Sequence, residues 1–183
     1  MKLLQFPALA LVSILLAACS NSGPDGRPVL ELSFGAAPID LSGTPARYVQ
    51  DISYGPAERN LFDIYLPDCD GPTPLVIYIH GGGFTGGDKQ GDSMEEEVRR
   101  FLEACVAHAA INYTLLTIPS EAEGTASAVA QGGVLTSLRD TARALQFMRY
   151  HYQSLNLDPE NVALYGGSAG AGASLWLGTH DDM

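Results

Sequence analysis

The nine residues with the clearest structural meaning are Val162-Ala163-Leu164-Tyr165-Gly166-Gly167-Ser168-Ala169-Gly170. The first four are apolar and suit a short buried strand, while the small apolar residues from Ala169 onward suit a buried helix. The Gly-x-Ser-x-Gly between them predicts a sharp strand-to-helix turn that projects the Ser168 hydroxyl. Gly166 and Gly170 lack the side chains that would collide in such a turn. Ser168 is the candidate nucleophile, and the Ala169 amide would point at a developing oxyanion.

A second motif, His80-Gly81-Gly82-Gly83, directly follows the apolar run Leu75–Ile79. That run is flanked by turn residues and predicts a buried strand of a parallel sheet. The motif resembles the HGGG loop of lipases and esterases. By that resemblance Gly82 and Gly83 join Ala169 as oxyanion donors, each worth about 3–4 kcal/mol in the transition state. His80 is then an orienting residue rather than the catalytic base.

The same glycines also fit the dinucleotide-binding pattern G-x-G-x-x-G at Gly81, Gly83 and Gly86. That motif needs a helix opening at its third glycine. Here residues 87–91 intervene, and an export signal would direct the chain away from cytoplasmic dinucleotides. A Walker A loop is excluded because no Gly-Lys-Ser/Thr follows the glycines.

Strands and helices alternate along the rest of the chain, which predicts an α/β sandwich with right-handed crossovers. Ser93 and Glu96 form a capping box for a helix that ends near Ala104. A loop is expected over 114–133. Other elements are strands at 48–52, 61–66, 106–113 and 162–165, helices at 94–104, 135–152 and 169–177, and a turn at 157–161.

The region from Tyr48 onward resembles the α/β-hydrolase superfamily, and within it the HGGG-bearing carboxylesterases of the hormone-sensitive-lipase-like and acetyl-esterase-like groups. Supporting stretches are Leu61–Pro67, Ala110–Tyr113 and Asp158–Val162. The resemblance implies a mostly parallel sheet with helices on both faces. It also implies ester hydrolysis through an acyl-enzyme on Ser168, with no metal or cofactor. A prolyl-oligopeptidase-like peptidase and a non-catalytic surface lipoprotein remain alternatives.

The rest of a catalytic triad is not evident in the sequence. In this superfamily an acid and then a histidine follow the nucleophile, but only 15 residues follow Ser168. On a helix, His180 would lie about 18 Å along the axis from Ser168; it is expected to cap that helix. His108 and His151 are expected to be structural. Residues 46–183 are therefore expected to be a partial hydrolase domain without its C-terminal part, poorly soluble and nearly inactive alone.

The N-terminus predicts export and lipid anchoring. Residues 1–18 have the layout of a lipoprotein signal peptide, with a short apolar run ending in Leu-Ala-Ala before Cys19. Cys19 is the expected lipidation site, although an ordinary signal peptide with a chance cysteine is the alternative. Residues 19–45 are expected to be a flexible tether. The predicted location is the bacterial cell envelope, where the protein would be a periplasmic or outer-membrane lipoprotein bound to the membrane through its lipid anchor.

The amino-acid composition bears on the partners, metal sites and disulfides that the chain can have. The 183 residues carry a formal net charge of −11, which argues against a nucleic-acid partner because phosphate binding needs clustered Lys and Arg. No cysteine and histidine spacing predicts a metal site. Cys69 and Cys105 could pair in an oxidising compartment, but the apolar surroundings of Cys105 favour a buried free thiol.

Overall fold

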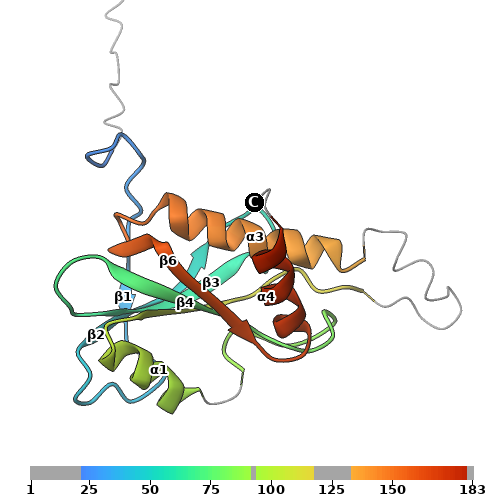
Figure 1. Cartoon of the computed structure of the whole chain (residues 1–183), viewed down its shortest axis with the longest axis horizontal. Coiled ribbons are helices and arrows are strands. Elements are labelled where there is room, and N and C mark those ends of the chain that lie inside the picture. Colours follow the sequence, from blue (N-terminus) through green and yellow to red (C-terminus); the bar gives the residue numbers. More distant parts are fainter. Residues whose placement is uncertain (1–21, 92–93, 118–132, 181–183) are drawn as a thin grey trace, which may run out of the picture.

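The computed structural model describes residues 22–91, 94–117 and 133–180, in which six strands form one sheet flanked by helices (Figure 1). Along the sheet the strand order is β1-β2-β3-β5-β4-β6. The strands are β1 Phe34–Gly35, β2 Ala46–Ser53, β3 Leu61–Pro67, β4 Thr73–Ile79, β5 Ala107–Ile111 and β6 Leu157–Gly166; the helices are α1 Glu95–Glu103, α3 Leu135–Tyr150 and α4 Ala169–Thr179.

The sheet has a parallel part and an antiparallel part. Strand β4 pairs in parallel with β5 on one side and β6 on the other. The remaining pairs, β1 with β2, β2 with β3 and β3 with β5, are antiparallel. Strand β2 consequently runs in the same direction as the three parallel strands. This is the expected mixed, mainly parallel sheet of the α/β-hydrolase fold, with the antiparallel strands supplied by the N-terminal half.

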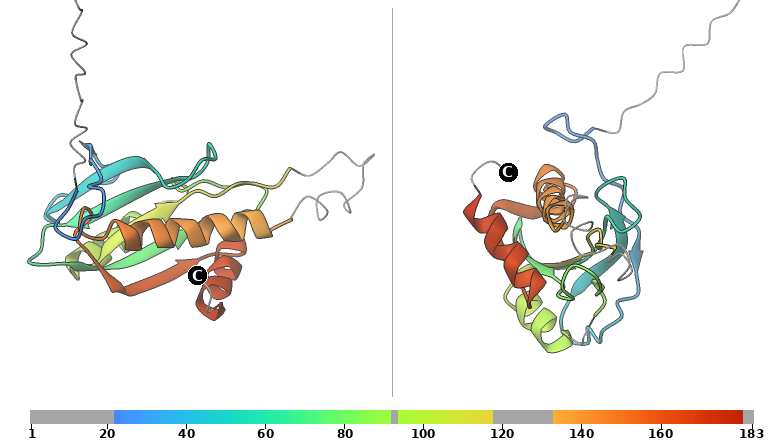
Figure 2. Two further views of the ribbon diagram at one scale, coloured as in Figure 1. Left: turned by 90° about the horizontal axis from the view of Figure 1, so that it is seen from above. Right: turned by 90° about the vertical axis from the view of Figure 1, so that its right-hand side faces the viewer.

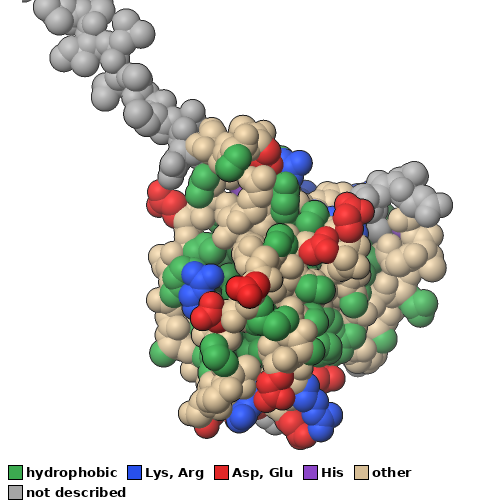
Figure 3. Space-filling view, turned by 60° about the vertical axis from the view of Figure 1, so that its left-hand side comes forward, with side chains coloured by type: hydrophobic (Ala, Val, Ile, Leu, Met, Phe, Trp, Pro, Cys, Tyr) green, Lys and Arg blue, Asp and Glu red, His purple; other side chains and the backbone are tan. Residues whose placement is uncertain are grey.

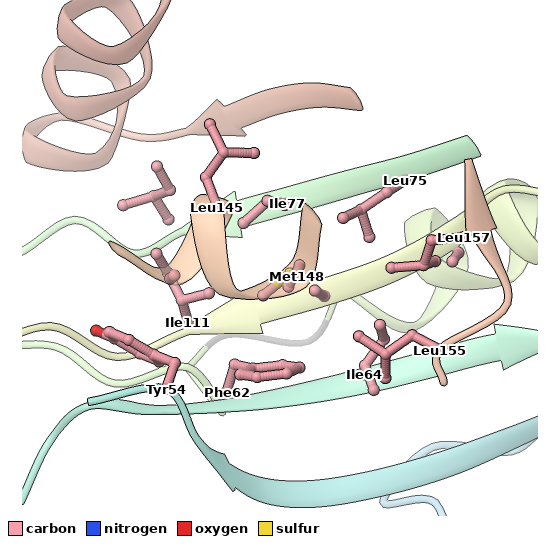
Figure 4. Packing of buried hydrophobic residues seen from close by; sticks show 14 of the residues in the cluster. Tyr54, Phe62, Ile64, Leu75, Ile77, Ile111, Leu145, Met148, Leu155 and Leu157 are labelled. Atoms are coloured by element: carbon pink, nitrogen blue, oxygen red, sulfur yellow. The ribbon is translucent and has the colours of Figure 1, made fainter. Parts of the chain in front are cut away.

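Side-chain alternation explains why helices cover both faces of this sheet. On β3, Phe62 and Ile64 face the main core under α3 and α4, whereas Tyr65 faces a smaller cluster with Val98 of α1. Figure 2 shows α1 on one side of the sheet and the other two helices opposite it. In Figure 4, Leu145 and Met148 of α3 lie over the apolar side chains of β3, β4 and β5. Burial on both faces is what the continuous apolar run of β4 requires.

The expectation that Cys105 is a buried free thiol is wrong. Helix α1 ends at Glu103, and Cys105 then takes a positive φ of 58° on the surface. Its amide and that of Val106 donate back to the carbonyls of Leu102 and Phe101, which closes the helix in a Schellman motif. That turn carries the Cys105 thiol away from the apolar face of α1, and Cys105 forms a disulfide with Cys69.

Two further element boundaries differ from expectation. The cap residue of α1 is Met94, which makes no side-chain cap hydrogen bond, and Ser93 lies outside the described residues. The turn expected at 157–161 is a bulge within β6, because Leu157 pairs with Thr73 whereas Val162 already pairs with Leu75. Asp158 holds this bulge by accepting hydrogen bonds from the Glu160 amide and the Asn161 side chain.

Helix α4 is only half buried, contrary to expectation. Ala173 and Leu177 enter the core, but Leu175 on the other side of the helix is 66% exposed. Small apolar residues all around a helix do not reveal which side will be covered, because they give no polar face.

Residues 22–45 are more structured than the expected tether. Arg27 donates from Nη1 to the Tyr150 carbonyl at 3.2 Å, and the Leu30 amide donates to Ser154 Oγ at 3.0 Å. Strand β1 then pairs with β2. The ordered domain therefore begins well before residue 46. The expected signal peptide at 1–18, Cys19 and most of the loop expected at 114–133 lie outside the described residues.

Candidate active site

The two glycine-rich motifs meet at the carboxyl ends of neighbouring parallel strands. Gly166 pairs with Ile79, so the turn after β6 lies beside the loop after β4. A Cβ built on Gly170 would lie 1.9 Å from the Ile79 carbonyl oxygen, which only glycine allows. A Cβ built on Gly81 would lie 3.5 Å from the Ser168 Cβ. The structure thus brings the candidate nucleophile and the triple-glycine loop to the same edge of the sheet.

Ser168 occupies a strained turn between β6 and α4. Its φ is 52° and its ψ is −115°, a combination that residues with a side chain rarely adopt. The side chain is exposed, and its hydroxyl makes no hydrogen bond with the described part of the chain. Ala169 begins α4, so its amide has no acceptor within the helix and lies at the positive end of the helix dipole. This is the local geometry expected of a serine nucleophile.

Successive carbonyls of the glycine loop are hydrogen-bonded within the protein. The His80 carbonyl accepts from Tyr113 Oη at 2.8 Å, and the Gly81 carbonyl lies 3.3 Å from the same hydroxyl. The Gly82 carbonyl accepts from the amides of Thr85 and Gly86. In a planar trans peptide the N–H points opposite to the C=O. The amides of Gly81, Gly82 and Gly83 are therefore turned away from these acceptor contacts, and within the described residues they donate to no backbone carbonyl of a turn, loop or cap.

Tyr113 is a residue that the motif analysis did not assign to the site. Its ring stacks on His80 with centroids 4.2 Å apart, and both residues are buried. Together with the hydroxyl contacts to the loop carbonyls, this stacking fixes the start of the loop. His80 is accordingly a buried loop residue, and the orienting role expected for it stays a prediction. No local sequence pattern indicates this role for Tyr113, since its hydrogen bonds to the loop reach residues more than 30 positions earlier.

The far end of the loop is held by a separate polar cluster that sequence reasoning also missed. Lys89 Nζ lies 2.8 Å from a carboxylate oxygen of Asp51 and 2.8 Å from one of Asp63. Burial alone would lower the pKa of Lys89, but the hydrogen bonds to the two carboxylates raise it. The Lys89 amide also donates to Oδ1 of Asn112, and Nδ2 of the same asparagine donates to the Asp88 carboxylate. Lys89 is therefore a cation that ties the loop to β2, β3 and the end of β5.

None of the four histidines is arranged as a base for Ser168. Both ring nitrogens of His80 have protein contacts, to Arg59 and the Gly81 carbonyl. His108 bonds Tyr165 Oη and pairs with Val76, three residues before the end of β4. His151 follows α3 beside a pocket of the N-terminal segment, and His180 bonds the Trp176 carbonyl, as expected for a helix cap.

Three features of the described residues bear on nucleic-acid, metal and membrane binding. On the face drawn in Figure 3, the few Lys and Arg groups lie close to Asp and Glu side chains and form no continuous basic area. Within the three described ranges, no group of three His, Cys, Asp or Glu side chains is placed to hold a metal ion. No helix among these residues is both long and apolar enough to cross a membrane.

The sheet, the flanking helices and the serine turn define a protein of the α/β-hydrolase fold. A family model described as BD-FAE matches residues 62–183, from the second residue of β3 through both glycine motifs and α4. The chain belongs to the BD-FAE family.

Curated relatives and solved structures agree with this assignment. Gut esterase 1 from Caenorhabditis elegans is 28% identical over 65% of the chain, and the probable carboxylic ester hydrolase LipM from Mycobacterium tuberculosis is 33% identical over 66%. The structure of a bacterial heroin esterase matches 75% of the chain with a TM-score of 0.54 and 26% identity. The alignments span 20% of gut esterase 1, 26% of LipM and 39% of the heroin esterase chain.

Proposed function

We propose that the protein is a carboxylic ester hydrolase that uses Ser168 as its nucleophile. The observation that carries this proposal is the meeting of Ser168 with the glycine loop, where Gly81 approaches the Ser168 side chain. Esterase relatives among the matched proteins support the reaction class. The loop His80–Gly83 favours ester cleavage over the peptidase alternative, since prolyl-oligopeptidase-like enzymes usually lack it.

In the proposed reaction Ser168 Oγ attacks the ester carbonyl and a tetrahedral oxyanion forms. The amides of Gly82, Gly83 and Ala169 donate to that oxyanion from positions fixed before the substrate arrives. Collapse of the intermediate expels the alcohol and leaves an acyl group on Ser168. Water then attacks the acyl-enzyme, which releases the acid and restores the serine. The proton that leaves Ser168 passes to a general base, which returns it to the departing alcohol; the base then takes a proton from the attacking water and returns it to Ser168. One hydroxyl and three backbone amides of this chain take part in these steps.

Deprotonation of Ser168 needs a general base within hydrogen-bond distance. Because the four histidines of the chain are held elsewhere, we propose that a histidine beyond these four supplies it. The chain as it stands is then expected to react slowly with esters. Its activity should be tested on protein produced from the complete coding sequence.

The test is covalent labelling with a fluorophosphonate, combined with hydrolysis of p-nitrophenyl acetate. Wild-type protein should be labelled and active, and Ser168→Ala should lose both properties. Ser174→Ala is the matched control, because Ser174 lies on the same helix and bonds only the Gly170 carbonyl. Hydrolysis that survives in Ser168→Ala, or a wild-type protein that neither reacts nor hydrolyses, would overturn the proposal in favour of another nucleophile or a non-catalytic protein.

We further propose that the protein is exported and anchored to a bacterial envelope membrane through a lipid on Cys19. The disulfide between Cys69 and Cys105 supports export, since such bonds persist in oxidising compartments. Labelled fatty acid should be incorporated by wild-type protein in cells and not by Cys19→Ala. Equal incorporation by the two proteins, or none by either, would contradict the anchor.

A further inference from the structure

Arg59, in the turn before β3, contacts the glycine loop at several points. Its Nη2 lies 2.8 Å from the Gly87 carbonyl and 3.4 Å from His80 Nε2. Its Nε donates to the Tyr113 carbonyl at 3.0 Å, and Nη1 lies 3.7 Å from an Asp88 carboxylate oxygen. One half-buried guanidinium therefore bridges both ends of the loop and the tyrosine that packs against it.

The contacts of His80 with Arg59 and with the Gly81 carbonyl agree on which ring nitrogen carries the proton. A guanidinium has donors and no acceptor, so His80 Nε2 must accept and present its lone pair. The proton then lies on Nδ1, which donates to the Gly81 carbonyl at 2.7 Å. Burial lowers the pKa of His80, and the positive charge of Arg59 lowers it further, against the opposing effects of the hydrogen bond to Gly81 and the charge of Asp88. These effects favour the neutral ring.

The protonated Nδ1 in turn orients a peptide of the oxyanion loop. The peptide between Gly81 and Gly82 has its carbonyl drawn toward His80, so its N–H, which belongs to Gly82, points the opposite way. If Nε2 carried the proton instead, Nδ1 would present a lone pair to the Gly81 carbonyl oxygen. Two acceptors 2.7 Å apart repel, and this peptide would be driven to rotate.

We infer that Arg59 is a positioning residue for the oxyanion hole: through His80 it orients the Gly82 amide toward the carbonyl oxygen of the ester that Ser168 attacks. The inference rests on the proposed esterase function and adds to it a residue outside both glycine motifs. Arg59 makes its contacts with His80, Gly87, Asp88 and Tyr113, and not with Ser168. Its effect on the reaction therefore passes through His80 and the loop backbone.

The opposite end of the loop has its own attachment, which makes the role of Arg59 separable from folding. The ion pairs of Lys89 with Asp51 and Asp63, and the hydrogen bond of its amide to Asn112, involve no atom of Arg59. Removing Arg59 should therefore release the His80–Gly87 segment without detaching the loop. The expected consequence is a slower chemical step with substrate binding preserved.

The test compares Arg59→Ala, Arg59→Lys and the control Arg149→Ala in protein from the complete coding sequence. Arg149 is an exposed arginine that bonds only the Pro159 carbonyl, at the strand end opposite the site. With p-nitrophenyl acetate, Arg59→Ala should lower kcat about 100-fold, as for loss of one oxyanion donor, with KM within about twofold of wild type. Added guanidinium should restore part of the rate, and the control should match wild type.

Arg59→Lys keeps the charge but cannot reach His80, Gly87 and Tyr113 together, so about a tenfold loss of kcat is expected. If Arg59→Ala fails to fold, the kinetics of Arg59→Lys provide the test. Wild-type kcat in either folded variant, or equal changes in kcat and KM without guanidinium rescue, would overturn the role of Arg59. Activity that persists in Ser168→Ala would instead overturn the proposed function, so the two failures are distinguishable.

Discussion

Gly170 packs directly on the carbonyl of Ile79, joining the first turn of α4 to the last residue of β4. The close approach exists because position 170 has no side chain; an added Cβ would lie 1.9 Å from the Ile79 oxygen and 3.0 Å from the His80 oxygen. This contact fixes where the serine turn lies relative to the glycine loop. It therefore couples the stability of the fold to the geometry of the site.

Gly170→Ala should destabilise the protein by about 1–3 kcal/mol, because backbone atoms must move apart to admit the methyl group. Esterase activity should fall with it, since the same shift separates Ser168 from the loop. Gly172→Ala is the control: position 172 is in the same helix and has open space beside it. That change should be neutral or stabilise by up to about 1 kcal/mol. Urea unfolding of the two variants measures the difference, and equal stabilities would contradict the contact.

Ser168→Gly should raise stability while abolishing activity. Ser168 has a φ of 52°, and glycine adopts positive φ without the steric cost that a Cβ brings. The serine side chain makes no cap hydrogen bond to α4, so replacing it with glycine removes no capping interaction. A net gain of about 1 kcal/mol over Ser168→Ala is expected. Thermal denaturation of both inactive variants provides the comparison; identical midpoints would show that the turn is unstrained.

Reduction of the disulfide should lower the free energy of unfolding by about 4 kcal/mol, the value expected for closing a loop of this length. The bond joins residues separated by 36 positions and ties the β3–β4 connection to the end of α1. Denaturation curves with and without dithiothreitol measure the loss. The double variant Cys69→Ser with Cys105→Ser should be as unstable as the reduced protein and unresponsive to the reductant. If dithiothreitol lowered the free energy of unfolding of the double variant, the reductant would be acting on a group other than this disulfide.

His108 should make the protein less stable as the pH falls below neutrality. Its burial lowers the pKa to about 4, whereas an unfolded histidine titrates near 6.5. Between these values the unfolded chain binds the additional proton, so stability decreases as the pH falls from 6.5 toward 4, by up to about 3 kcal/mol. His108→Gln should flatten this dependence. Unfolding at several pH values tests the prediction, and an unchanged pH dependence in His108→Gln would contradict it.

Local patterns were sufficient to predict the elements that the site depends on. The apolar run of β4 and the small residues of α4 predicted a strand and a helix whose cores match the structure. Ser168 was predicted from the Gly-x-Ser-x-Gly spacing, and the loop His80–Gly83 from its resemblance to the HGGG loop of lipases and esterases; both motifs depend on glycine at fixed positions. Such requirements act between near neighbours in the chain, so they are visible in the sequence.

Contacts between distant segments were decided by the tertiary structure. Arg59 and Tyr113 contact the glycine loop from distant segments, and Lys89 ties the end of the loop to Asp63 of β3. No local sequence pattern marks these contacts. The pairing of Cys69 with Cys105 was likewise not predicted. The turn after the end of α1 exposes the Cys105 thiol, and that turn is seen only in the structure. The sequence by itself determined which backbone turns could form; the order of strands in the sheet determined which side chains would hold them, since that order brings together residues that lie far apart along the chain.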